Sequence, residues 1–138
     1  MPTPDELRED LASARADFRD ALSEVAAGWE RVPPGDGAWS PRQTAEHAIP
    51  GEAHMTTLVC TACGYPGVEF DPKPVYTTAD DAVAALDAMV ELTNKKLKYV
   101  TEGDLVKTYE QWTSAQFLAH SANHLREHAQ QMREAANA

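Results

Sequence analysis

Five histidines fall in two clusters and are the residues of this chain best suited to chemistry. His47 and His54 lie in one segment, and His120, His124 and His128 recur at steps of four near the end of the sequence. Residues four apart share a face of an α-helix, so the imidazoles of His124 and His128 can converge on one cation. Imidazole titrates near neutral pH and is therefore a good metal ligand at pH 7.

The position of each histidine relative to the apolar face of its helix decides whether it can face the interior. Taking Leu125 as the centre of that face, at about 100° per residue, His128 lies about 60° away and His124 about 100° away. Both residues therefore border the core. His120 lies about 140° away by the same arithmetic, so we expect it to point toward solvent.

A cation needs a third ligand, which the upstream cluster can supply. His47 and His54 are seven residues apart, and Pro50 between them is expected to kink their helix. One imidazole from this segment and the downstream pair would form a three-nitrogen site with open positions, typical of catalytic rather than structural metal centres. His54 is better explained as a solvated side chain. The spacing alone leaves open that none of these histidines binds a metal.

The segment from His124 to His128 also matches the H-x-x-E-H pattern of one class of zinc peptidases, in which the glutamate is the general base. Those enzymes use a third, acidic ligand far downstream. Only ten residues follow His128, so we expect no such ligand and reject a peptidase. Glu127 points about 160° from the apolar face and is expected to be solvated, with a contact to the His124 ring as the alternative.

Cys60 and Cys63 have the spacing of a redox motif, but their position argues against that role. Redox pairs of this type lie at a helix N-terminus, where the helix dipole lowers the pKa of the thiol, whereas this pair closes a helical segment. Two thiols alone cannot complete a zinc site either. We expect both residues to be reduced, small side chains at the edge of the core.

Capping chemistry and apolar periodicity predict four helices. A Ser or Thr followed three residues later by an acid or amide can satisfy two backbone donors reciprocally, and this pattern occurs at Thr3, Ser40, Thr78 and Thr113. Apolar residues then recur at steps of three and four, which predicts helices over about 4–32, 40–63, 78–100 and 113–136. The third is expected to bury Val83, Leu86, Val90 and Leu97. No segment is predicted to form a strand.

These helices indicate an all-α fold, a four-helix bundle formed as a single domain over residues 1–138. The segment 64–77 contains two glycines and three prolines and is long enough to cross an end of the bundle. The second and third helices can therefore run parallel or antiparallel, and the sequence leaves both arrangements open.

The charge balance narrows the classes of partner. Twenty-two acidic and twelve basic residues give a formal charge of −10, which disfavours binding to nucleic acid or to anionic membranes. No apolar run approaches the roughly 18 residues of a membrane span, and the first residues do not resemble a signal peptide. Two cysteines are too few for a disulfide-stabilised secreted fold. We therefore expect a cytoplasmic protein.

Two motifs resemble those of the DinB/YfiT-like metalloenzymes, which are four-helix bundles. Trp39-Ser40-Pro41-Arg42-Gln43-Thr44-Ala45-Glu46-His47 is similar to the second-helix motif, in which a Trp precedes a metal-binding His by eight positions. The segment from His120 to Met132 is similar to the last-helix motif, H-x-x-x-H-x-x-x-H-x-x-Q followed by an aliphatic residue. The chain has Ala129-Gln130 where the family often has Arg-Gly.

The resemblance implies a divalent cation, zinc or nickel, held by His47, His124 and His128. It also implies a class of thiol-dependent transferases, isomerases or hydrolases that use low-molecular-weight thiols, and a possible homodimer. The departure at Ala129-Gln130 leaves the three ligand positions intact and bears on the substrate.

Two functions of different classes are compatible with these residues. The first is a divalent-metal-dependent enzyme resembling thiol S-transferases and acting on a small molecule; no catalytic residue or general base is assigned, and Asn123 and Glu127 are candidates for contacts with the metal ligands. The alternative is a non-catalytic metal-binding or stress-associated interaction module of the same fold. A di-iron bundle is disfavoured because it needs ligands on all four helices, and the first and third helical segments contain no histidine.

Overall fold

Four capping boxes begin the four long helices at the predicted residues. In the computed structural model, which describes residues 1–138, these helices are α1 (Pro4–Glu24), α2 (Pro41–Cys63), α3 (Ala79–Leu97) and α4 (Ser114–Ala136). Each cap hydroxyl accepts a hydrogen bond from the backbone amide three residues on, and the side chain of that residue accepts one from the cap amide. The all-α fold predicted from the sequence is confirmed.

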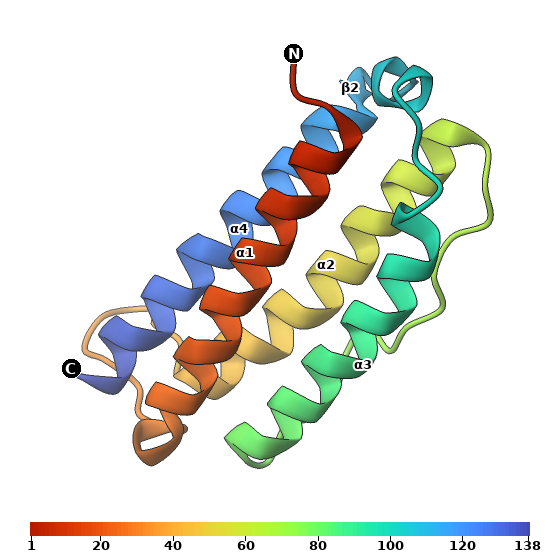
Figure 1. Cartoon of the computed structure of the whole chain (residues 1–138). Helices are drawn as coiled ribbons and strands as arrows, with labels where there is room; N and C mark the ends of the chain where they lie inside the picture. Colours follow the sequence, from red (N-terminus) through yellow and green to blue (C-terminus); the bar gives the residue numbers. More distant parts are fainter.

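The helices form a bundle in which two run one way and two the other (Figure 1). α1 and α4 run in one direction, and α2 and α3 both run in the opposite direction, because the segment 64–78 returns the chain along the length of the bundle. α4 packs against both α1 and α2, and α3 packs against the other sides of α1 and α2. The arrangement that the sequence left open is therefore the parallel one for α2 and α3.

Each helix turns an apolar stripe inward, and the stripes meet in one core. The largest fully buried apolar side chains come from all four helices and from the segments that connect them: Leu11, Phe18, Leu22, Val25, Val59, Leu86, Leu97, Leu105, Leu125 and Met132. On α3 the buried positions are Ala79, Ala82, Leu86, Met89, Thr93 and Leu97. Val83 and Val90, which the sequence predicts to be buried, lie half-buried beside this stripe.

α1 ends at Glu24, although its apolar series predicts a helix that continues to about residue 32. The chain instead passes through a 3₁₀ turn, η1 (Ala26–Gly28), and then leaves the bundle, so that Val32 is 58% exposed. A Cβ atom at Gly28 would lie 3.2 Å from the backbone of Ala136. Close packing of this turn against the end of α4 therefore replaces the last turns of the predicted helix.

A short hairpin before α4 was not predicted. β1 (Thr108–Tyr109) and β2 (Trp112–Thr113) pair antiparallel, after the 3₁₀ turn η2 (Gly103–Val106). The two turn residues, Glu110 and Gln111, have φ values of 48° and 74°. Two-residue turns of this kind normally contain Asn or Gly, so the sequence gives no signal for the hairpin.

None of the helices is both long enough and apolar enough to cross a membrane.

Candidate functional site

The three histidines proposed as ligands lie close together between α2 and α4, two helices that pack directly against each other. The ring centres of His47 and His128 are 5.1 Å apart, and those of His124 and His128 are 5.4 Å apart. The structure thus brings together residues that are about 80 positions apart in the sequence, through the packing of two amphipathic helices. His128 is half-buried, whereas His47 and His124 are exposed.

These imidazoles line a cavity of about 170 Å³ between the two helices. Its polar lining includes His47, Glu52, His54, Ser121, His124 and His128. Gly51 also lines the cavity, and a Cβ atom at Gly51 would meet no neighbouring atom within 4 Å. α2 continues through Pro50 beside it. The glycine thus leaves open space in the wall of the cavity.

His128 is held in a defined orientation by a residue of the same helix. Its Nδ1 lies 3.1 Å from Oε1 of Gln131. An amide oxygen only accepts hydrogen bonds, so Nδ1 carries the proton and Nε2 keeps its lone pair free for a ligand bond. Burial lowers the pKa of His128, the Gln131 hydrogen bond opposes this, and His47 and His124 lower it further. The ring is thereby favoured in the neutral form that a metal requires.

Two tryptophans flank the histidine cluster. The indole of Trp39 meets the His47 ring edge-on at 5.1 Å, and the indole of Trp112 meets His120 in the same way at 5.2 Å. His120 in turn lies 4.1 Å from His124. The expectation that His120 points to solvent is wrong: it is half-buried, because the unpredicted hairpin brings Trp112 over it.

Burial lowers the pKa of His120, and the neighbouring His124 lowers it further. His54 is exposed, as expected, and lines the outer part of the same cavity. Glu127 and Asn123 are also exposed. The structure shows no hydrogen bond from either of them to a histidine, so neither has a contact that would position a ligand.

The donor set fits a divalent cation in type and spacing, but the rings are not yet turned toward a common point. Imidazoles that share a zinc ion through bonds of about 2.0–2.1 Å have ring centres about 5 Å apart, close to the two separations observed. The rings nevertheless pack edge to face, at 78° and 81°. No group of three or more His, Cys, Asp or Glu side chains is arranged to hold a metal ion as it stands. Metal binding would require the rings of His47 and His124 to rotate toward His128; both are exposed, and rotation of exposed side chains is rapid.

A buried carboxylate in the same cavity was not predicted. Glu52 is 2% exposed, and its Oε1 accepts a hydrogen bond of 2.5 Å from Nε of Arg15 on α1. Arg15 also donates to Asn94 and Thr93 of α3, at 2.6 and 2.7 Å. Burial raises the pKa of Glu52, and the Arg15 guanidinium opposes this rise. Because an arginine in a protein stays protonated and Glu52 is its only carboxylate partner, we describe the two as an ion pair.

A sequence signal for this pair exists. Arg15 falls within the apolar stripe formed by Leu11, Ala14 and Phe18, so a charged residue at that position requires a buried partner. The identity of the partner, 37 residues away, depends on how the helices pack.

Only two buried side-chain atoms in the chain lack a hydrogen-bond partner: Oε2 of Glu52 and Oγ of Ser121. Both residues line the histidine cavity. An unpaired buried polar atom costs about 1–3 kcal/mol, so native proteins rarely leave one without a purpose. The lining of the cavity therefore combines four imidazoles with two residues that each have an unsatisfied polar atom.

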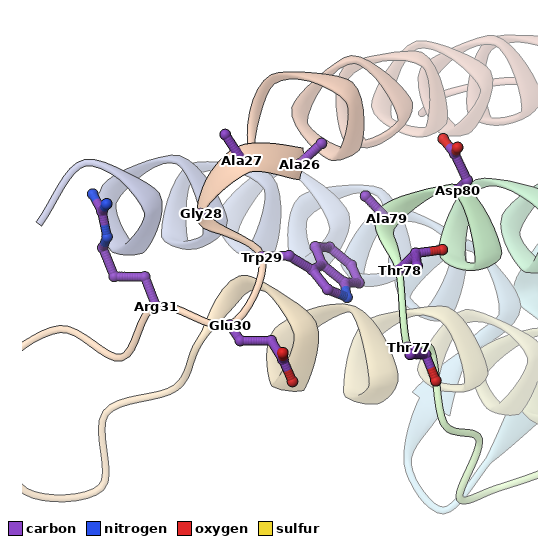
Figure 2. Close-up of a pocket in the computed structure, with 10 residues that line it drawn as sticks. All are labelled: Ala26, Ala27, Gly28, Trp29, Glu30, Arg31, Thr77, Thr78, Ala79 and Asp80. Atoms are coloured by element: carbon purple, nitrogen blue, oxygen red, sulfur yellow. The ribbon is translucent and has the colours of Figure 1, made fainter.

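A larger hollow at one end of the bundle does not offer comparable chemistry. It has a volume of about 490 Å³ and lies between η1 and the start of α3 (Figure 2). The Trp29 indole donates a hydrogen bond to the carbonyl of Tyr76, and Arg31 points away from the tryptophan toward the end of α4, where it donates to the Ala136 carbonyl at 2.7 Å. No histidine or cysteine lines this hollow.

The two cysteines are buried, as the sequence predicts. Cys60 and Cys63 are buried and not disulfide-bonded. Burial raises the pKa of both thiols, so neither is activated as a thiolate.

One family accounts for most of the chain. The DinB superfamily matches residues 10–132, a span that includes all three candidate ligands and both residues of the buried ion pair. No curated protein and no solved structure matches the chain. The match to the family and the four-helix bundle agree with the resemblance of the two histidine motifs. The chain therefore belongs to the DinB superfamily.

Proposed function

We propose that this protein is a divalent-metal-dependent enzyme of the thiol S-transferase type, with His47, His124 and His128 as the metal ligands. The observation that carries the proposal is the pair of ring separations at His128, 5.1 and 5.4 Å, in a cavity that opens to solvent. Zinc and nickel are the expected ions, because both accept imidazole nitrogen. Three protein ligands leave a position for a substrate.

A divalent cation bound there would supply the Lewis acidity that lets a thiol ionise near neutral pH. The other roles belong to residues of the chain. Gln131 fixes the His128 ring, and the exposed rings of His47 and His124 leave the cavity open to a small molecule. In the overall reaction the thiol sulfur forms a bond to an electrophilic carbon, and the bond from that carbon to its leaving group breaks. The leaving group departs with the electron pair, and the thiol proton passes to it or to solvent.

A thiol-consumption assay tests this proposal. The protein is loaded with zinc or nickel and mixed with 2-mercaptoethanol and 1-chloro-2,4-dinitrobenzene, a broad electrophile, and loss of free thiol is followed against a chelated sample. Metal-dependent consumption that is lost in His124→Ala, but retained in His54→Ala, would support the enzyme. His54 is the matched control because it lines the same cavity without belonging to the proposed ligand set.

The alternative is a non-catalytic metal-binding or interaction module of the same fold. The observation that favours it is that the three rings pack edge to face and do not converge. A protein of this kind would bind an ion, or none, and would consume no thiol above the chelated background.

The partners follow from the same proposal. We infer a low-molecular-weight thiol as the small-molecule substrate, a cytoplasmic location where such thiols are reduced, and no role in binding nucleic acid or membranes, consistent with the charge of −10. A homodimer is part of the proposal, and its test is the mass of the protein in solution by light scattering.

A further inference from the structure

Glu52 lines the histidine cavity, in the part that we call its floor, and one of its carboxylate oxygens has no hydrogen-bond partner in the protein. Glu52 is 2% exposed and uses only Oε1 in its bond with Arg15. Arg15 donates from Nε, Nη1 and Nη2 to Glu52 Oε1, Asn94 and Thr93, and it makes no hydrogen bond to Oε2. Oε2 therefore has no donor within the protein, and a molecule in the cavity that Glu52 lines can supply one.

A second polar atom has the same requirement. Ser121 is 4% exposed, lies on α4 and lines the same cavity, and its Oγ also has no partner. Elsewhere in the chain every buried side-chain polar atom is hydrogen-bonded. The two unsatisfied atoms thus come from the two helices that also carry the histidines. Both can accept a hydrogen bond, and the Ser121 hydroxyl can also donate one.

We propose that Glu52 Oε2 and Ser121 Oγ form a subsite that binds a hydrogen-bond-donating group, a hydroxyl or an amine, of the small thiol substrate. The subsite disfavours a carboxylate in the same position, because two oxyanions would then face each other in a buried space. This inference rests on the proposed function and deepens it: it names the class of thiol, one with a donor group close to its sulfur.

The size of the cavity suits this class. A volume of about 170 Å³ has room for several water molecules or for a small organic molecule. Its apolar lining, Ala48, Met55 and Leu125, can cover a short carbon chain. A thiol of a few carbons that carries a donor can therefore place its sulfur near the imidazoles while its donor reaches the floor.

Cobalt-substituted protein provides a binding readout that does not depend on turnover, because thiol binding to cobalt changes the absorption spectrum. Dissociation constants are measured for 2-mercaptoethanol, cysteamine, 1-propanethiol and mercaptoacetate. The first and third have the same number of heavy atoms and differ only in the donor. The informative quantity is the ratio of the dissociation constants of these two thiols, compared between wild type and each variant. The contribution of the carbon atoms that the two thiols share cancels in this ratio.

Two variants remove the subsite. Ser121→Ala deletes a hydroxyl that no protein group uses, so it leaves the fold intact. The double variant Arg15→Met/Glu52→Met removes the ion pair as a unit, which is often tolerated where loss of one partner is not. Relative to wild type, we expect the preference for 2-mercaptoethanol over 1-propanethiol to fall about tenfold in the double variant and several-fold in Ser121→Ala, with cobalt uptake unchanged in both.

Ser114→Ala is the control, because Ser114 is equally buried but is hydrogen-bonded outside the cavity; its preference should equal that of wild type. An unchanged preference in both subsite variants would overturn the inference and show that water alone fills the floor. Failure to take up cobalt, or uptake with no spectral response to any thiol, would instead overturn the proposed function, and this inference with it.

Discussion

Two buried carboxylates in this protein have opposite surroundings. Asp104, 3% exposed, has both oxygens engaged: Lys107 Nζ donates to Oδ1 at 2.8 Å, and the Tyr65 hydroxyl and the Thr101 amide donate to Oδ2 at 3.1 and 3.0 Å. Glu52, 2% exposed, has one oxygen engaged and one free. The Lys107 ammonium and the Thr101 amide lower the pKa of Asp104 to about 2, whereas burial raises that of Glu52.

The difference separates a group that stabilises the fold from one that is available for a ligand. Asp104 belongs to η2 and joins it to Tyr65 after α2 and to Lys107 before the hairpin, and both of its oxygens are already hydrogen-bonded within the fold. Glu52 lines the histidine cavity, is anchored to α1 and, through Arg15, to α3, and keeps one oxygen without a hydrogen-bond partner. The predictions below test this contrast.

The largest effect is expected from breaking the buried ion pair on one side only. Arg15→Met leaves the Glu52 carboxylate buried and uncompensated, which typically costs 3–5 kcal/mol. The measurement is the free energy of unfolding in urea. The double variant Arg15→Met/Glu52→Met should lie within about 1 kcal/mol of wild type, and equal losses in the single and double variants would contradict the ion pair.

The next effect concerns Asp104 and depends on pH. Its pKa is lowered from an ordinary 3.8 to about 2 in the folded state, so its contribution is complete above about pH 5 and is lost as the pH falls toward 2. Asp104→Asn should cost about 2 kcal/mol at pH 7, somewhat less because Lys107 is half exposed.

The check is the free energy of unfolding from pH 7 to pH 2. The loss on acidification should be smaller in Asp104→Asn than in wild type. Glu52, whose pKa is raised, contributes no such loss when the pH falls. A variant that retains the full loss on acidification would show that Asp104 is not responsible.

A third comparison uses two glycines. Gly51 lines the cavity and has space for a Cβ, so Gly51→Ala should raise the free energy of unfolding by about 0.5–1 kcal/mol through helix propensity, and should weaken thiol binding. At Gly28 a Cβ atom would lie 3.2 Å from the backbone of Ala136. Gly28→Ala should therefore lower the free energy of unfolding by about 1 kcal/mol or more. Thermal denaturation shows whether each variant is more or less stable than wild type. A change in the same direction in both variants would contradict the packing described for the two glycines.

The smallest effect is expected at Ser121. Because its hydroxyl has no protein partner, Ser121→Ala should change the free energy of unfolding by less than about 0.5 kcal/mol. Ser114→Ala, which loses hydrogen bonds to the Cys63 thiol and the Lys107 carbonyl, should cost about 1 kcal/mol. A larger cost at Ser121 would mean that the hydroxyl is used within the fold.

Features encoded by neighbouring residues could be predicted from the sequence. The four capping boxes each involve residues three apart, and the pairing of His124 with His128 needs only one helical turn. The position of His47 beside His128 also followed, from the resemblance of its motif to a known family.

Features that depend on distant packing could not be predicted. The hairpin has Glu110 and Gln111 at turn positions that usually contain Asn or Gly, so it could not be predicted. The contact of Trp112 with His120 depends on the hairpin and could not be predicted either. The ion pair of Arg15 and Glu52 joins helices that lie diagonally across the bundle. The sequence shows only that Arg15 is a charged residue within an apolar stripe. This indicates a buried partner but does not identify it.

Metal content is the most direct test of the central claim. Untagged protein, reconstituted with zinc and passed through a desalting column, is analysed by mass spectrometry beside His47→Ala, His124→Ala, His128→Ala and the control His54→Ala. We predict about one ion per chain in wild type and in His54→Ala, and loss of most of it in the other three. Equal metal content in all five proteins, or none in wild type after reconstitution, would contradict the three-histidine site.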